Sequence, residues 1–274
     1  MRGFVDVHTH LIHPRFAEDA DEAAVRAREA GVTAVIVNGL EPRSNRAVLE
    51  LCDRYEHLHA AMGIYPVDAS AHAIAAEGWD HPFDPPAVFD LDAEIAFIDA
   101  NADRIIAVGE VGLDRHWVKS EAALQAQDDV LRKLCEVAKR HDLPVILHTR
   151  KAEQATLDLL LEMGVEKADF HCYGGKSKLA VKIAEAGYYI SIPPAVVRSQ
   201  QFQSYARKLP MDRILTETDA PYMGPRPGER NEPAFVPEGV AAIAAARGDD
   251  VESVASAVAD NFERLFGVPV PDRG

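Results

Sequence analysis

Six residues of the types that bind divalent metal ions stand at or directly after runs of β-forming residues: His8, His10, Glu110, His148, His171 and Asp219. Neutral imidazole is the commonest metal ligand in proteins, and carboxylate oxygens suit the harder divalent ions. Residues two apart on a strand point to the same side, so His8 and His10 can aim at one point. A lone His-x-His pair more often just ends a strand. A metal site therefore requires that the fold bring the other four residues to the same place.

Six protein ligands exceed the needs of one tetrahedral zinc ion and suit two metal ions about 3.5–4 Å apart that share a carboxylate. We expect Glu110 to be this bridge, because it comes from the middle of the series of strands. The other ligands divide into two sets: His8, His10 and Asp219 for one metal, and His148 with His171 for the other. Such a site lowers the pKa of a bound water and holds a phosphoryl oxygen. Asp219 can also accept the proton of that water. The predicted chemistry is metal-assisted hydrolysis, with Glu110 and Asp219 as catalytic residues.

The elements that must position these residues alternate along the chain between short β-rich runs and longer helical runs. The strand runs are 4–7, 33–37, 58–63, 105–108, 144–147, 168–170, 188–192 and the run that opens at 214–215. Eight strand–helix units predict a parallel sheet with right-handed crossovers, closed into a (β/α)8 TIM barrel. Additional C-terminal helices are expected at 237–246 and 251–266, within one α/β domain of residues 1–274.

A barrel would bring the six residues together, because the carboxyl ends of its strands form one rim, and active sites lie at that rim. The alternative fold is a doubly wound open sheet. It requires a glycine-rich phosphate turn after the first strand, and His8-Thr9-His10 stands there instead.

Composition excludes several classes of protein. With 274 residues, of which 47% are hydrophobic, the chain can bury a large core, and its net charge of −15 argues against a broad basic face for duplex DNA. Bound metals and local Arg or Lys can still reverse the sign within a cleft. The sequence has no apolar run of about 18 residues, so we expect no membrane span. We also expect no signal peptide, because no charged and apolar leader stands before the first strand. Cys52, Cys135 and Cys172 are far apart, which suits a reducing cytoplasm. A monomer is compatible with the sequence.

Several motifs together resemble the TatD family of metal-dependent deoxyribonucleases, in the amidohydrolase-like barrel superfamily. They are Asp6-Val7-His8-Thr9-His10, Gly109-Glu110-Val111-Gly112-Leu113-Asp114, Leu147-His148-Thr149-Arg150, Phe170-His171-Cys172, Glu217-Thr218-Asp219-Ala220-Pro221-Tyr222, Arg230-Asn231-Glu232-Pro233 and 261–267. The resemblance implies that the six residues above are the metal ligands. It also implies hydrolysis of DNA phosphodiesters, commonly from the ends of single strands, with divalent metal. Two ions are expected, Mg²⁺, Mn²⁺ or Zn²⁺.

Other residues near the predicted rim are candidates for substrate binding. Arg150 can reach a phosphate bidentately, although an ion pair with Glu217 or Asp219 is an equal alternative. Exposed bases can stack on the aromatic residues that follow strands three, four, six and eight, which are Tyr65, Trp117, Tyr173 and Tyr222. Arg230 lies after the last strand and adds to a locally positive mouth. The connection 66–89 has no clean period, and such long connections are often functional.

Two other functions remain open. The same barrel can hydrolyse a C–N or ester bond in a small molecule or an aminoacyl adduct. Many amidohydrolase-like sites use a carbamylated lysine as the metal bridge, and the presence of Glu110 on the fourth strand favours the nuclease. The remaining hypothesis is a non-catalytic barrel with structural metals or none.

Overall fold

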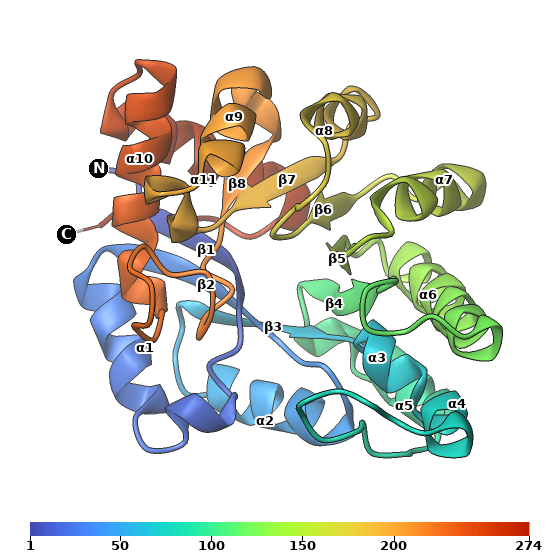
Figure 1. The fold of residues 1–274 in the computed structure, drawn as a ribbon. Coiled ribbons are helices and arrows are strands. Elements are labelled where there is room, and N and C mark those ends of the chain that lie inside the picture. Colours follow the sequence, from blue (N-terminus) through green and yellow to red (C-terminus); the bar gives the residue numbers. More distant parts are fainter. Residues whose placement is uncertain (274) are drawn as a thin grey trace.

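The computed structural model describes residues 1–273, and it is a parallel barrel with helices on its outer side (Figure 1). Within these residues, eight strands pair in chain order. They are β1 (Phe4–Thr9), β2 (Val32–Asn38), β3 (Leu58–Met62), β4 (Ala107–Gly112), β5 (Val145–His148), β6 (Ala168–Phe170), β7 (Tyr189–Ile192) and β8 (Ile214–Thr216). The predicted (β/α)8 barrel with additional C-terminal helices is confirmed.

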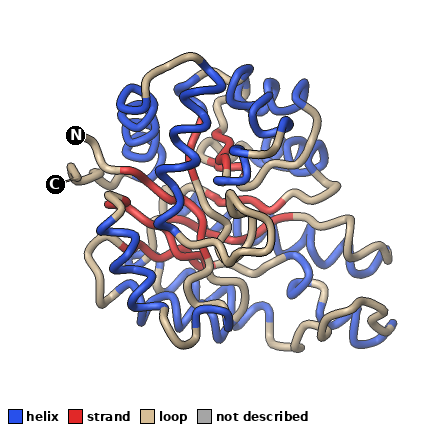
Figure 2. The backbone as a smooth tube through the Cα atoms, turned by 60° about the vertical axis from the view of Figure 1, so that its left-hand side comes forward, coloured by secondary structure: helices blue, strands red, loops and turns tan. Residues whose placement is uncertain are grey.

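Helices follow the strands and cover the sheet from outside (Figure 2). They are α1 (Ala20–Glu29), α2 (Pro42–Cys52), α3 (Pro66–Ala69), α4 (Ala71–Glu77), α5 (Leu91–Ala100), α6 (Glu121–Arg140), α7 (Glu153–Met163), α8 (Ser177–Glu185), α9 (Gln200–Lys208), α10 (Val236–Arg247) and α11 (Val251–Phe266). Short 3-10 helices are η1 (Pro14–Phe16), η2 (Ala102–Arg104), η3 (Pro194–Val197), η4 (Met211–Arg213) and η5 (Pro233–Phe235). In the part of the chain that the structure describes, no helix combines the length and apolarity needed to cross a membrane.

The last strand meets the first at the carboxyl end of the barrel. The amide of Asp219 donates to the carbonyl of His8 at 2.7 Å, and the amide of His10 donates to the carbonyl of Ala220 at 2.9 Å. Thr9 and Ala220 form a parallel bridge. These bonds attach the segment after β8 to β1, and they set Asp219 beside the two histidines.

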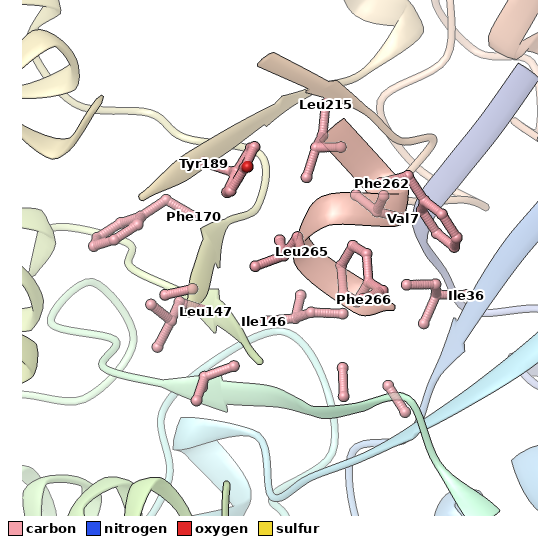
Figure 3. Close-up of a cluster of buried hydrophobic side chains, with 14 of the residues drawn as sticks. Val7, Ile36, Ile146, Leu147, Phe170, Tyr189, Leu215, Phe262, Leu265 and Phe266 are labelled. Carbon is pink, nitrogen blue, oxygen red and sulfur yellow. The ribbon is translucent and has the colours of Figure 1, made fainter. Parts of the chain in front are cut away.

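The amino end of the barrel is covered by α11. The Asn261 amide donates to the carbonyls of Met211 and Ile214, both at 2.8 Å, and Ile214 is the first residue of β8. Phe262 lies against His59 near the start of β3, with ring centroids 6.3 Å apart. Figure 3 shows Phe262, Leu265 and Phe266 among the buried side chains of several strands. The last helix therefore completes the core at the end opposite to the strand carboxyl termini.

The bounds of several strands differ from the predicted ones by one or two residues, and two differences are larger. The connection 66–89, expected to be irregular, begins with the short helices α3 and α4, and only its second half lacks regular structure. Pro66 starts α3, where a missing amide costs nothing. Strand β4, expected at 105–108, runs from Ala107 to Gly112, so Glu110 lies inside the strand instead of following it.

Candidate metal centre

Glu110 lies at the middle of a cluster of four imidazoles, and its two oxygens face different pairs of them. Its Oε2 atom lies 3.4 Å from Nε2 of His8 and 3.3 Å from Nε2 of His10. Its Oε1 atom lies 3.0 Å from Nδ1 of His148 and 3.0 Å from Nε2 of His171. One buried carboxylate thus connects two sets of ligand atoms, which is the geometry expected of a bridging ligand.

Asp219 joins the side of the cluster that His8 and His10 form. Its Oδ1 atom lies 4.0 Å from Nε2 of His8 and 3.8 Å from Nε2 of His10. The Nε2 atoms of the two histidines are only 3.1 Å apart. The His8 ring is also stacked on that of His171, with centroids 3.7 Å apart. The fold therefore brings all six predicted ligands together, from β1, β4, β5 and the segments after β6 and β8.

The chemistry of these donor atoms fits divalent cations. Three groups have ligand atoms within 4.8 Å of one another: His8, His10 and Glu110; His8, His171 and Asp219; and Glu110, His148 and His171. Imidazole nitrogens and carboxylate oxygens are ligands that Zn²⁺ and Mn²⁺ accept. Several nitrogen lone pairs that converge on one carboxylate oxygen repel one another unless protons or cations lie between them. The cluster is capable of binding metal.

A second layer of side chains orients the imidazoles. Asp114 Oδ2 lies 2.9 Å from His148 Nε2, while its Oδ1 accepts bonds from the amides of His116 and Trp117 at 2.8 and 2.7 Å. The Nδ1 atom of His10 lies 3.1 Å from the carbonyl of Asn38. Such partners set the tautomer and direction of a metal-binding imidazole.

Glu217 is a member of this layer whose contact with the imidazoles the sequence did not predict. Its Oε1 atom accepts a bond from the amide of Cys172 at 2.8 Å, and its Oε2 accepts one from Ser191 at 2.7 Å. Oε2 also lies 3.5 Å from Nδ1 of His171. The sequence does contain a signal for this contact. Glu217 stands two residues before Asp219, and residues at that spacing in an extended segment point to the same side.

Burial and neighbouring charges give the two central carboxyls opposite pKa shifts. Burial by itself raises the pKa of Glu110, but the charge of His171 and bonds from the surrounding imidazoles outweigh it and hold the pKa well below its ordinary value. Burial raises the pKa of Asp219 to about 7, against the opposing charges of His171 and His10. Glu110 is therefore ionised, whereas Asp219 can exchange a proton near neutral pH.

Three predicted substrate contacts lie beside the cluster or on its exposed rim. The ring of Tyr65 meets the ring of His148 edge to face, with centroids 4.9 Å apart. Tyr222 is 50% exposed, and its hydroxyl lies 3.1 Å from Nε2 of His13. Arg150 is exposed and lies over the ring of Trp117 at 4.8 Å. Within residues 1–273, Arg150 has no ion pair with Glu217 or Asp219, so that alternative is wrong.

Two other predicted contacts are corrected by the structure. Tyr173 is fully buried; its hydroxyl donates to the carbonyl of Lys176 at 3.2 Å, and its ring packs against Tyr205. It offers no face to a base. Arg230 donates to both oxygens of Asp19 at 2.6 Å and lies over the ring of Phe16. Its guanidinium holds the loop after β8 to the start of α1 and has little capacity left for a phosphate.

Comparisons with known proteins agree with the fold and identify the family. The family model described as TatD-related DNase matches residues 5–267. The chain is 34% identical to the human protein named deoxyribonuclease TATDN3 over 269 residues, which cover 96% of this chain and 94% of that protein. It is 30% identical over 275 residues to the Salmonella typhimurium protein named 3'-5' ssDNA/RNA exonuclease TatD, with 96% and 98% covered. The crystal structure of YjjV, a TatD homologue from Escherichia coli, superposes with a TM-score of 0.82 at 27% identity, covering 97% of this chain and 98% of that one.

Proposed function

The chain belongs to the family of TatD-related DNases, and we propose that it hydrolyses phosphodiester bonds of DNA, from the ends of single strands, with two divalent metal ions. The observation that carries this proposal is the position of Glu110, whose two oxygens each face a separate pair of imidazoles. The relatives named above as a deoxyribonuclease and as an exonuclease on single-stranded DNA and RNA support the substrate class.

The proposed ligands fall into two sets, according to which oxygen of Glu110 each histidine faces. His8, His10 and Asp219 would hold one ion, His148 and His171 the other, and Glu110 both. When bound, Mg²⁺, Mn²⁺ or Zn²⁺ ions would supply Lewis-acid polarisation of a phosphoryl oxygen and lower the pKa of water.

The side chains of this protein have distinct tasks in the reaction. Asp219 would accept the proton of the attacking water, because its carboxylate lies beside the ligand atoms of His8 and His10. The water adds to phosphorus, one P–O bond to the neighbouring sugar breaks, and the sugar oxygen leaves with the proton that Asp219 took from the water. The products are a nucleotide and a shortened strand. Asp114 fixes the direction of the His148 ring during this exchange. We propose that Tyr65, Tyr222 and Arg150 contact the substrate from the rim.

The reaction is proposed to occur in the cytoplasm, on a monomer. Cys52, Cys135 and Cys172 are free thiols, which suits a reducing compartment. The six proposed ligands come from a single chain, so the site is complete without a partner subunit.

The deciding experiment follows the release of nucleotides from end-labelled single-stranded DNA by purified protein, before and after treatment with a chelator and restoration with each of the three metals. An amide and ester panel is run beside it. We expect nucleotide release that the chelator abolishes and metal restores, with two metal ions per chain by elemental analysis. Amide or ester turnover without metal-dependent nucleotide release would replace the nuclease by an amidohydrolase.

A further inference from the structure

An aromatic and cationic patch lies beside the metal cluster, and Arg150 is its only member to which the proposed function gives a role. Its aromatic members are Trp79, His81 and Phe83 from the segment between α4 and α5, and Trp117 from the segment between β4 and α6. Its cationic members are Arg115, Lys119, Arg150 and Lys151. We call these eight residues the rim patch.

Trp117 is the centre of the rim patch. His81 and Phe83 approach its ring edge to face, with centroids 5.3 and 5.0 Å away. His81 Nε2 also lies 3.0 Å from the carbonyl of Trp117, and the indole of Trp79 donates to the carbonyl of Phe83 at 2.9 Å. These contacts hold the 79–83 segment in place while the side chain of Phe83 stays 43% exposed. An aromatic side chain of that size, left open on a fixed loop, is a surface for stacking.

The four cations of the rim patch are exposed and free for a ligand. Among residues 1–273, none of the four has a carboxylate oxygen within 4.0 Å, whereas cations farther along α6, such as Arg132 and Lys133, form ion pairs. The guanidinium carbon of Arg150 lies over the ring of Trp117 at 4.8 Å, a contact that leaves its N–H groups for an anion. These cations give the rim patch a local positive charge in a chain whose net charge is −15.

The rim patch is connected to the candidate metal centre through one carboxylate. Asp114 contacts His148 at 2.9 Å with one oxygen and receives the amide of Trp117 at 2.7 Å with the other. The amide of Arg115 donates to the carbonyl of Arg150 at 3.0 Å, which joins the segments after β4 and β5. A ligand that extends from the cluster over this side of the rim meets aromatic rings and cations together.

We propose that the rim patch is a second binding site for the polynucleotide: a base of a single strand stacks on Phe83, whose ring Trp117 supports, and Arg150, Lys119 and Lys151 bind its phosphates. This inference rests on the proposed function for its substrate class. Single-strand sites combine stacking rings with a cationic track, because every base has a π-face and every linkage a charge. A paired duplex keeps its bases stacked on one another and gains only the charge contacts. The patch therefore selects single strands longer than the part held at the metal centre.

The test compares Phe83→Ala with Val88→Ala, a matched control at a 50% exposed apolar position in the same connection. Binding of fluorescein-labelled dT10 and dT2 to chelator-treated protein is measured by anisotropy, so no turnover is required. Phe83→Ala should weaken binding of dT10 by about tenfold, within the range for loss of one stacked base. It should leave dT2, and hydrolysis of bis(p-nitrophenyl) phosphate by the metal-loaded enzyme, within about twofold.

The cationic residues of the rim patch are tested by the dependence of DNA affinity on salt concentration. Lys119→Ala should reduce the slope of log affinity against log salt for dT10 by about 0.7, the value for one phosphate contact on a single strand. Lys133→Ala, whose ammonium pairs with Asp92 at 2.6 Å, is the matched control and should leave the slope unchanged.

The outcomes separate the two proposals. Equal affinity of wild-type protein and Phe83→Ala for dT10, with DNA hydrolysis intact, overturns the rim patch and leaves the nuclease standing. Patch-dependent binding of dT10 by a protein that hydrolyses no phosphodiester overturns the nuclease and leaves the binding site. Equal weakening of dT2 and dT10 in Phe83→Ala indicates a general disturbance of the site and also contradicts the patch.

Discussion

At the carboxyl end of the barrel, Glu110 is buried among four histidines beside the half-buried Asp219, whereas at the amino end Phe262, Leu265 and Phe266 are buried among aliphatic side chains. Burial of apolar surface stabilises a fold, and burial of ionisable groups costs free energy unless partners offset it. The carboxyl end therefore holds the reactive groups and lowers the stability of the fold, whereas the amino end stabilises the fold and holds none of the proposed ligands. Substitutions at the two ends should affect different measurements.

The largest effect is expected from Glu110→Ala. Loss of the residue that faces both ligand sets should lower turnover of DNA by about 10³-fold or more, since metal chemistry contributes several kcal/mol. Bound metal should fall below the wild-type content, as elemental analysis measures, and the far-UV spectrum should stay unchanged. Full activity in this variant would exclude Glu110 as the bridge.

Phe262→Ala should have the opposite signature. Truncation of a fully buried ring should cost about 3 to 5 kcal/mol of unfolding free energy. Turnover per folded molecule and metal content should stay near wild type, measured well below the melting temperature. Leu161→Ala, at a 55% exposed position on α7, is the control and should change stability by about 0.5 kcal/mol or less. Loss of metal in Phe262→Ala would mean that the two ends are coupled.

His59→Gln tests the amino end by pH. Burial, with a smaller effect of His57, lowers the pKa of His59 from 6.5 to about 4. The folded protein therefore keeps His59 neutral while the unfolded chain protonates it. Its contribution to stability is complete above pH 6.5 and is lost as the pH falls from 6.5 towards 4. Between pH 7 and 5, wild type should lose about 2 kcal/mol more than His59→Gln in urea unfolding. Equal losses of unfolding free energy in wild type and His59→Gln would contradict the lowered pKa of His59.

The smallest effect is expected from Tyr173→Phe, at the carboxyl end but inside the core. Loss of the hydroxyl removes one hydrogen bond to Lys176 and should cost about 1 kcal/mol of stability. KM for single-stranded DNA should not change, because the ring is fully buried. A higher KM at unchanged stability would restore Tyr173 as a substrate contact.

Most of the fold could be predicted from the sequence because the barrel repeats one simple pattern. The helix at 251–266 and the strand at 168–170 have the expected bounds. The helices α3 and α4 were missed, since four and seven residues are too few to show a helical period. Their apolar residues Val67 and Ile74 instead form a small separate cluster with Val118 and Ala123, which only the folded chain reveals.

The sequence by itself determined which residues meet at the metal cluster, because a residue at the end of a parallel barrel strand has one rim to occupy. Only the tertiary structure decided which atoms face one another: that the two oxygens of Glu110 serve separate pairs of histidines, and that Asp114 supports His148. It also buried Tyr173, paired Arg230 with Asp19, and placed Phe83 beside Trp117. The reason is physical. Strand period fixes the side on which a residue lies, whereas the partners of a loop side chain depend on other loops that pack against it.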